Sequence, residues 1–238
     1  MVHDEQRVSW QRLLSTVLQR MGTLQAEHRD LEGALKTYEE ALSLSRLLVS
    51  ADSNYTFHVR SMSMVLRRMG HVHGERGDLA AALALYQESL RLRRDLMQRD
   101  SDRVRCLVDV LRSLGDVGGA QLAQGDLKAA RTSYEEAHRV AQRLVKLDLD
   151  HPSYRHTLAL VLAGQAQLAE VEGNLPESLG YLRDALAELE LLVRSPSPEK
   201  DWLRNAAFCR AKIARLEAVT HKKRRRTRTP KRKAKPTP

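Results

Sequence analysis

Few residues in this sequence have both the type and the spacing that catalysis or metal binding requires. His71 and His73 are two residues apart, so they do not share a face of a helix, and no carboxylate or cysteine completes a metal site around them. The run 115–119 has the glycines of a phosphate-binding loop, but it lacks the preceding strand and the Gly-Lys-Ser/Thr ending. The sequence therefore predicts no metal, no cofactor and no enzyme activity.

The remaining reactive side chains fit structural roles. The acidic pairs at 39–40 and 135–136 recur in register with the repeat of the chain, which indicates solvent-side charges rather than a general acid and base. Cys106 and Cys209 both lie within apolar helical patterns. We interpret them as buried thiols of a protein in a reducing compartment.

The carboxyl-terminal segment 221–238 concentrates the positive charge of the chain. The whole chain has 40 Lys and Arg against 30 Asp and Glu, whereas this segment has ten basic residues and no acidic one, so residues 1–220 are formally neutral. The ten are Lys222, Lys223, Arg224, Arg225, Arg226, Arg228, Lys231, Arg232, Lys233 and Lys235. Since the segment has no apolar side chain beyond Ala234, we predict a disordered basic tail.

Three roles fit the composition of this tail. Cations without interleaved aromatic side chains suit phosphates rather than stacked bases, so nucleic acid would be bound through its backbone. If the source is eukaryotic, the two basic clusters would indicate nuclear import. The third alternative is a solubilising terminus with only non-specific affinity for RNA.

The start of the chain shows no secretion signal. It does not open on a basic segment followed by an apolar stretch, and no run in the sequence approaches the ~18 apolar residues of a membrane span. We therefore expect a cytoplasmic protein without a membrane partner, or a nuclear protein if the source is eukaryotic.

The strongest pattern in the chain is a period of 48 residues. Its columns, which need no gaps, include Gly22, Gly70, Gly118 and Ala166; Asp30, Asp78, Asp126 and Asn174; and Tyr38, Tyr86, Tyr134 and Leu182. Apolar residues recur every three or four positions in two stretches of each copy, which predicts two amphipathic helices per copy. A polar Gly-Asp or Gly-Asn break separates the stretches in three copies. The first copy has Arg29 in place of glycine, so we expect a less favourable backbone conformation in that turn.

These patterns predict an all-α protein, an α-solenoid of four helix-turn-helix repeats plus a C-terminal capping helix. The repeats span about 8–54, 55–102, 103–150 and 151–198, and the capping helix spans 199–219 of a helical domain that covers 1–220. In the capping helix, Arg210 replaces the leucine found at 18, 66, 114 and 162. We expect Arg210 to face water, because no second helix follows to cover it.

The columns resemble the tetratricopeptide repeat, whose signature is a small residue, Ala twelve later, an aromatic four after that and Ala three further on. The matching sets are Gly22, Ala34, Tyr38 and Ala41; Gly70, Ala82, Tyr86 and Ser89; Gly118, Ala130, Tyr134 and Ala137; and, more weakly, Ala166, Ser178, Leu182 and Ala185. The period is longer than the usual ~34 residues of the family and is similar to a long variant found in many bacterial proteins. The resemblance covers about 8–219.

The resemblance implies a concave, protein-binding face built from the first helix of each repeat. The groove residues expected there are Gln19, Thr23, Arg67, Arg68, His71, Arg112, Asp116, Leu160 and Gln167. We predict a bound peptide with acidic groups near the three arginines and an apolar anchor near Leu160, although these arginines would also suit a merely solvated face. The clamp that some members of the family use for a peptide carboxylate is not expected, because Asp116 has the wrong sign.

Two function hypotheses of different classes follow. The first is a non-catalytic scaffold that binds a protein or peptide partner in the concave groove. The alternative is an adaptor that associates with nucleic acid through the basic tail. Salt separates them, because binding to phosphates weakens steeply as the salt concentration rises and burial of apolar surface does not.

Overall fold

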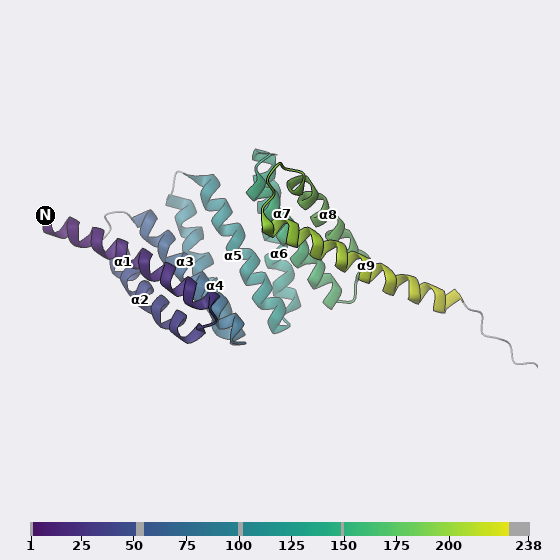
Figure 1. The fold of residues 1–238 in the computed structure, drawn as a ribbon, viewed down its shortest axis with the longest axis horizontal. Coiled ribbons are helices and arrows are strands. Elements are labelled where there is room, and N and C mark those ends of the chain that lie inside the picture. The colour runs from purple at the N-terminus through teal and green to yellow at the C-terminus, as the bar shows by residue number, and fades with distance from the viewer. Residues whose placement is uncertain (1, 51–54, 100–101, 149, 229–238) are drawn as a thin grey trace, which may run out of the picture. The chain divides into compact units, whose positions relative to one another are not determined.

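The computed structural model describes residues 2–50, 55–99, 102–148 and 150–228, with side chains between 6 and 220. Within these residues the chain forms helices and turns without a strand (Figure 1). The helices are α1 (Val2–Glu27), α2 (Leu31–Ser50), α3 (Tyr55–Glu75), α4 (Leu79–Arg99), α5 (Arg103–Gln124), α6 (Leu127–Leu147), α7 (Pro152–Val171), α8 (Leu175–Val193) and α9 (Lys200–Arg228). The predicted all-α fold is confirmed.

The first of two compact units, Met1–Leu149, contains three helical pairs. Helices α1 and α2, α3 and α4, and α5 and α6 pack as pairs, and each new pair packs on the one before it through α2 with α3 and α4 with α5. We call the first helix of each pair helix A and the second helix B. This consecutive packing is that of an α-solenoid, because each repeat buries its apolar face only against its neighbours.

The second unit, Asp150–Pro238, contains the fourth pair and the capping helix. Helix α7 packs on α8, and α8 packs on α9. Glu170 of α7 forms ion pairs with Lys212 at 2.8 Å and with Arg215 at 2.6 Å, which ties α7 to α9. Arg210 is exposed and pairs with Glu190 at 3.1 Å, so the prediction that it faces water is confirmed.

Close packing of a glycine against a tyrosine ring explains two columns of the repeat. A Cβ atom on Gly70 would lie 2.5 Å from Cε1 of Tyr86, and one on Gly118 would lie 3.1 Å from Cε1 of Tyr134. Both distances are below ordinary van der Waals contact, so glycine lets helix A approach the ring of helix B. In the fourth repeat Ala166 has the extra carbon, and the ring is correspondingly replaced by Leu182.

The turns between helices A and B behave as the sequence predicts. Asp30, Asp78, Asp126 and Asn174 each accept a hydrogen bond from the backbone N–H three residues later. The residue before each cap has a positive φ: about 80° for the three glycines and 65° for Arg29. Arg29 is the one non-glycine residue with a positive φ in the described part of the chain. The first turn therefore has the backbone strain that the sequence predicts.

Two helices are longer than the sequence predicts. Helix α1 begins at Val2 rather than near residue 8, because the apolar pattern starts at Trp10 and carries no signal for the polar turns before it. Helix α9 continues to Arg228, nine residues beyond the predicted 219, because Lys and Arg are good helix formers and the first proline after it is Pro230. The last predicted tail residues, 229–238, lie outside the described residues.

Candidate functional site

The structure uses three of the predicted groove residues to join the first two repeats. Arg68 of α3 donates from Nη1 to the backbone oxygen of Gln19 at 3.0 Å and to Oγ1 of Thr23 at 2.7 Å, both on α1. Gln19 is itself buried and donates to Oγ of Ser61 at 2.9 Å. These groups therefore satisfy one another, and the guanidinium of Arg68 is already held by α1.

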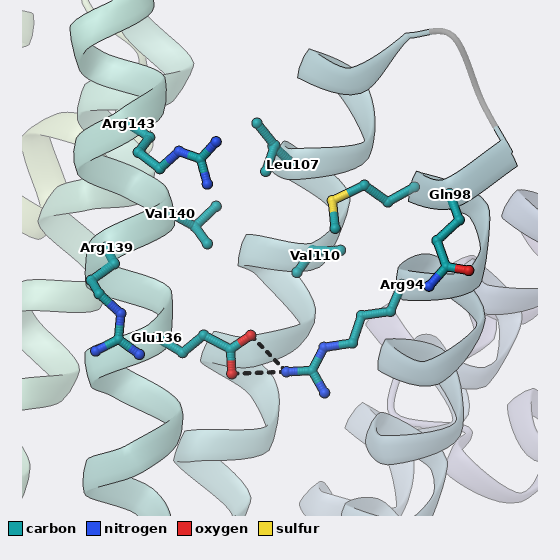
Figure 2. A pocket seen from close by; sticks show the side chains of 9 residues that line it. Arg94, Gln98, Leu107, Val110, Glu136, Arg139, Val140 and Arg143 are labelled. Carbon is teal, nitrogen blue, oxygen red and sulfur yellow. Dashed lines mark hydrogen bonds and ion pairs between the residues drawn. The ribbon is translucent and has the colours of Figure 1, made fainter.

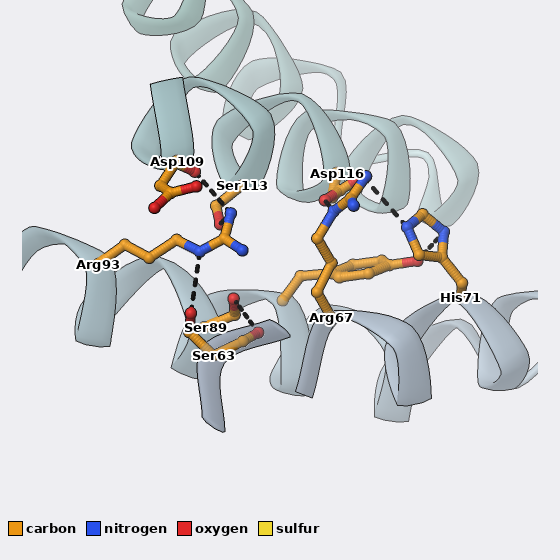
Figure 3. A network of polar contacts seen from close by, with 9 residues as sticks. Ser63, Arg67, His71, Ser89, Arg93, Asp109, Ser113 and Asp116 are labelled. Carbon is orange, nitrogen blue, oxygen red and sulfur yellow. Dashed lines mark hydrogen bonds and ion pairs between the residues drawn. The ribbon is translucent and has the colours of Figure 1, made fainter. Parts of the chain in front are cut away.

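A second set of predicted groove residues joins the second and third repeats (Figure 3). Arg67 of α3 forms an ion pair with Asp116 of α5, and Nε2 of His71 lies 3.7 Å from Oδ1 of the same carboxylate. Nδ1 of His71 is 3.1 Å from the hydroxyl of Tyr86. Burial lowers the pKa of His71, and Asp116 opposes this shift only in part. Asp116, which has the wrong sign for binding an anion, is thus the counter-ion of Arg67.

The other predicted residues do not join these two clusters. Arg112 of α5 is exposed. Leu160, at 47% exposure, and Gln167, also exposed, lie on α7 in the second unit. The tail lysines and arginines lie beyond the described side chains.

A buried arginine that the sequence analysis did not single out lies beside these clusters (Figure 3). Arg93 of α4 is 5% exposed and donates to Oγ of Ser63 at 3.1 Å, to Oγ of Ser113 at 3.1 Å and to the backbone oxygen of Asp109 at 2.7 Å. Burial lowers its pKa to about 10, so the guanidinium stays charged at neutral pH. The carboxylate of Asp109 is held by Arg60 at 2.9 Å. This network links α3, α4 and α5.

A groove between two helices B combines an apolar floor with exposed arginines (Figure 2). We call it the α4–α6 groove; it is lined by Arg94, Met97 and Gln98 of α4, Leu107 and Val110 of α5, and Glu136, Arg139, Val140 and Arg143 of α6. Its cavity has a volume of about 450 Å³. The floor is apolar, because Leu107, Val110 and Val140 face the opening from α5 and α6.

Arginines dominate the charge of the α4–α6 groove. Arg94 donates from Nη2 to both carboxylate oxygens of Glu136, at 2.6 and 2.8 Å, across the groove. Arg139 and Arg143 are exposed and lie one helical turn apart on α6, at the spacing of side chains that share a face. The lining therefore contains three guanidinium groups and one carboxylate.

The preceding repeat provides an internal reference for this pair of arginines. One period earlier, the equivalents of Arg139 and Arg143 are Arg91 and Asp95, which form an ion pair at 3.5 Å. The second repeat thus neutralises its own charge at these positions, whereas the third repeat presents two like charges. The sequence carries a signal for this difference, because Asp95 of the second repeat is replaced by Arg143 one period later.

Other kinds of site are not formed by the described residues. Within them, no group of three or more His, Cys, Asp and Glu side chains could hold a metal ion. Cys106 and Cys209 are buried thiols, as predicted. No helix in the described ranges has the length and apolar character needed to cross a bilayer.

Comparisons with known proteins agree with the helical pairs. A family model described as "Tetratricopeptide repeat" matches residues 64–102 and 110–153. These two segments thus match the family that the sequence columns resemble. No curated protein sequence matches it.

Solved structures resemble these tetratricopeptide repeats in fold. BtubC (BKLC) from P. vanneervenii matches with a TM-score of 0.60 and 15% identity over 98% of this chain and 94% of that chain. The MamA protein (12% identity, 78% of this chain and 97% of that chain) and the de novo designed helical repeat protein DHR64 (20% identity, 92% and 97%) have TM-scores of 0.33 and 0.32. The first similarity supports the fold. Tetratricopeptide repeats in general are scaffolds for protein interaction, and the helical pairs of this chain are arranged in the same way.

Proposed function

We propose that this chain is a non-catalytic scaffold that binds an acidic segment of a partner protein in the α4–α6 groove. The observation that carries the proposal is the exposed pair Arg139 and Arg143 above an apolar floor, at positions where the preceding repeat has an internal ion pair. An acidic side chain would meet the arginines, and an aliphatic or aromatic side chain next to it would enter the cavity.

Charge supports this choice of ligand. Like charges one turn apart on a helix destabilise it by about 0.2–0.5 kcal/mol, and a bound carboxylate would relieve that repulsion. Arginine forks also bind carboxylates through two parallel hydrogen bonds, which gives direction as well as attraction. On the face predicted from the sequence, by contrast, Arg67 and Arg68 already bind Asp116, Thr23 and a backbone carbonyl.

The floor of the groove supports an apolar anchor. A cavity of about 450 Å³ is within the usual range of ligand sites, which combine an apolar lining with a few placed polar groups. Buried anchor residues commonly supply most of the affinity of such interfaces, while the charged rim controls the rate and specificity of association. We therefore expect moderate sensitivity of binding to salt.

Selection from a displayed library of random peptides tests the proposal. The full chain should enrich peptides with adjacent acidic and large apolar residues, and the double variant Arg139→Glu/Arg143→Glu should bind the selected peptides at least about tenfold more weakly. Lys36→Glu/Arg46→Glu is the matched control, because it changes the net charge equally at exposed positions on α2. Enrichment of neutral or basic peptides, or equal weakening in both double variants, would contradict the proposal.

The helix-A face is a second candidate surface for the same function. Among the predicted groove residues, Arg112 is the exposed arginine, so Arg112→Glu should weaken binding of the selected peptides only if they bind there. A result in which Arg112→Glu is the damaging change and Arg139→Glu/Arg143→Glu is harmless would move the site to helix A.

A nucleic-acid adaptor is the second candidate function, because the tail holds the whole net charge of +10. Fluorescence anisotropy with DNA and RNA at two salt concentrations tests it, comparing the full chain with a variant whose ten tail cations are glutamine. Binding that requires the cations and falls steeply with salt would support this function. Equal binding by both proteins would remove it.

A further inference from the structure

Helix α1 presents an apolar face that nothing in its own unit covers. Trp10, Leu14, Val17, Met21 and Leu24 recur at helical spacing and are 44–68% exposed. We call this set the α1 face; Leu13, which is 52% exposed, flanks it. From Trp10 to Leu24 it runs for about 21 Å at ~1.5 Å per residue. Contiguous apolar patches of this kind mark interaction surfaces on soluble proteins.

The repeat shows what this face does elsewhere in the chain. One period later, the equivalent positions on α3 are His58, Met62, Val65, Met69 and Val72, and all five are at most 8% exposed because α3 packs on α2. On α5 they are Cys106, Val110, Ser113, Val117 and Ala120, which are at most 7% exposed beside α4. The α1 face is therefore a helix-packing surface, and the described unit has no earlier helix B to cover it.

We propose that the α1 face pairs with the α1 face of a second copy of this chain, forming a two-fold symmetric dimer. Two pairs of exposed apolar positions are symmetric about Val17: Trp10 and Leu24 are each seven residues away, and Leu13 and Met21 are each four residues away. Two antiparallel α1 helices therefore bring Val17 of one copy opposite Val17 of the other and Trp10 opposite Leu24. An isologous contact needs this kind of self-complementary surface.

Charges at the ends of the α1 face favour the antiparallel arrangement. Exposed Arg7 lies ten residues before Val17 and exposed Glu27 lies ten residues after it. Antiparallel pairing brings the arginine of each copy toward the glutamate of the other, whereas parallel pairing would place like charges together. Opposite charges at an interface rim guide register and orientation.

A head-to-tail contact between copies is disfavoured by the capping helix. The surface of α9 that would receive the α1 face carries exposed Arg210, where helices A of the repeats have a leucine. Burying that guanidinium would break its pair with Glu190 and leave a charge without compensation. Pairing of two α1 faces buries apolar side chains without this cost.

The mass of the full chain in solution, measured by light scattering after gel filtration over micromolar concentrations, tests the proposal. We expect a dimer, and we expect Val17→Glu to raise its dissociation constant at least about a hundredfold, because two carboxylates would meet at the symmetry axis. Leu191→Glu is the matched control: Leu191 is 49% exposed and Val17 is 51% exposed, but Leu191 lies on α8. Circular dichroism of each variant confirms that it has folded.

Disulfide cross-linking tests the geometry separately from the mass. Val17→Cys should give a covalent dimer on mild oxidation, because its Cα atoms would lie near the symmetry axis, and Leu191→Cys should not. A monomer at all concentrations, or a dimer that survives Val17→Glu, would overturn the proposal. So would a monomer that binds phospholipid vesicles through α1 and loses that binding in Val17→Glu, since the face would then dock on a lipid surface.

Discussion

The second and third repeats have the same backbone plan and differ in where they place charge. In the second repeat Arg93 of helix B lies buried against Ser63 of helix A. One period later these positions are Ala141 and Leu111, at 0% and 1% exposure. The first repeat is again polar, because Ser15 and Ser45 share a hydrogen bond of 3.2 Å. The contact between helices A and B therefore changes from polar to apolar along the chain without altering the pairing.

On the surface of helix B the third repeat, not the second, has the unbalanced positive charge. The second repeat pairs Arg91 with Asp95, while the third leaves Arg139 and Arg143 exposed beside a cavity. The second repeat thus buries an arginine and pairs the charges at these two surface positions, and the third repeat has an apolar interior and two exposed arginines there. The comparison teaches that the glycine, tyrosine and aspartate columns fix the fold, which leaves the remaining columns to carry contacts between repeats and with partners.

Exchanging the interior residue between the repeats should have the largest effect. Ala141→Arg would bury a guanidinium beside Leu111, which offers no hydrogen-bond acceptor, and we expect a loss of more than about 4 kcal/mol in the free energy of unfolding. Urea denaturation followed by circular dichroism measures this loss.

The reverse change is the control for this exchange. Arg93→Met should alter stability by less than about 1.5 kcal/mol in either direction, because an apolar side chain of similar length removes the cost of burying the charge. If Ala141→Arg and Arg93→Met lower the free energy of unfolding by similar amounts, the hydrogen-bond acceptors around Arg93 are not what lets the second repeat bury an arginine.

The glycine columns should respond unequally in the two repeats. Gly70→Ala places a carbon 2.5 Å from the ring of Tyr86, and we expect it to destabilise the protein by about 1–3 kcal/mol. Gly118→Ala has 3.1 Å available, and the ~1 kcal/mol gained in helix propensity should nearly offset the smaller overlap. Urea midpoints measure both effects. Adding Tyr86→Leu to Gly70→Ala should recover part of the loss, as the fourth repeat already pairs alanine with leucine.

Most of the fold could be predicted from the sequence because its signals are local. The spacing of Gly22, Gly70 and Gly118 gives the period, and apolar residues at every third or fourth position give the helices. The cap residues and the strained Arg29 were also predicted correctly. The early start of α1 and the late end of α9 were missed, because polar helical turns lack an apolar pattern.

The candidate site was harder to predict, because side-chain pairing between repeats is not a local property. Arg67 and Asp116 are 49 residues apart, and the sequence shows them as separate charges rather than as an ion pair. Arg68 was predicted as a groove residue, and its hydrogen bonds to Gln19 and Thr23 of α1 are contacts that the sequence does not indicate. The exposed pair Arg139 and Arg143 does leave a signal in the sequence, because the acidic member of the pair Arg91–Asp95 becomes an arginine one period later.

The first turn offers a stabilising change of about 1 kcal/mol. Arg29 has a φ of 65°, a conformation that costs a non-glycine residue roughly 1–2 kcal/mol, whereas the equivalent residues of the next three turns are glycines. Arg29→Gly should therefore stabilise the protein, even though it removes an exposed ion pair with Glu75. Thermal denaturation measures the gain, and Arg29→Ala is the control that loses the ion pair and keeps the strain. If both variants lose stability equally, the ion pair outweighs the strain.

The smallest expected difference between the repeats is in their response to acid. Burial lowers the pKa of His58, aided by Arg12, and also that of His71, where Asp116 and Glu75 oppose it and Arg67 adds to it.

The folded state thus favours neutral imidazole, so this contribution to stability is complete above pH 6.5 and is lost as the pH falls from 6.5 toward the folded pKa values. The third repeat has Cys106 and Gly119 at these positions and therefore no histidine there. Urea denaturation at about pH 7.5 and about pH 5.5 should show a smaller acid loss for His58→Leu/His71→Gln than for the natural sequence. Equal losses would place the acid sensitivity outside the second repeat.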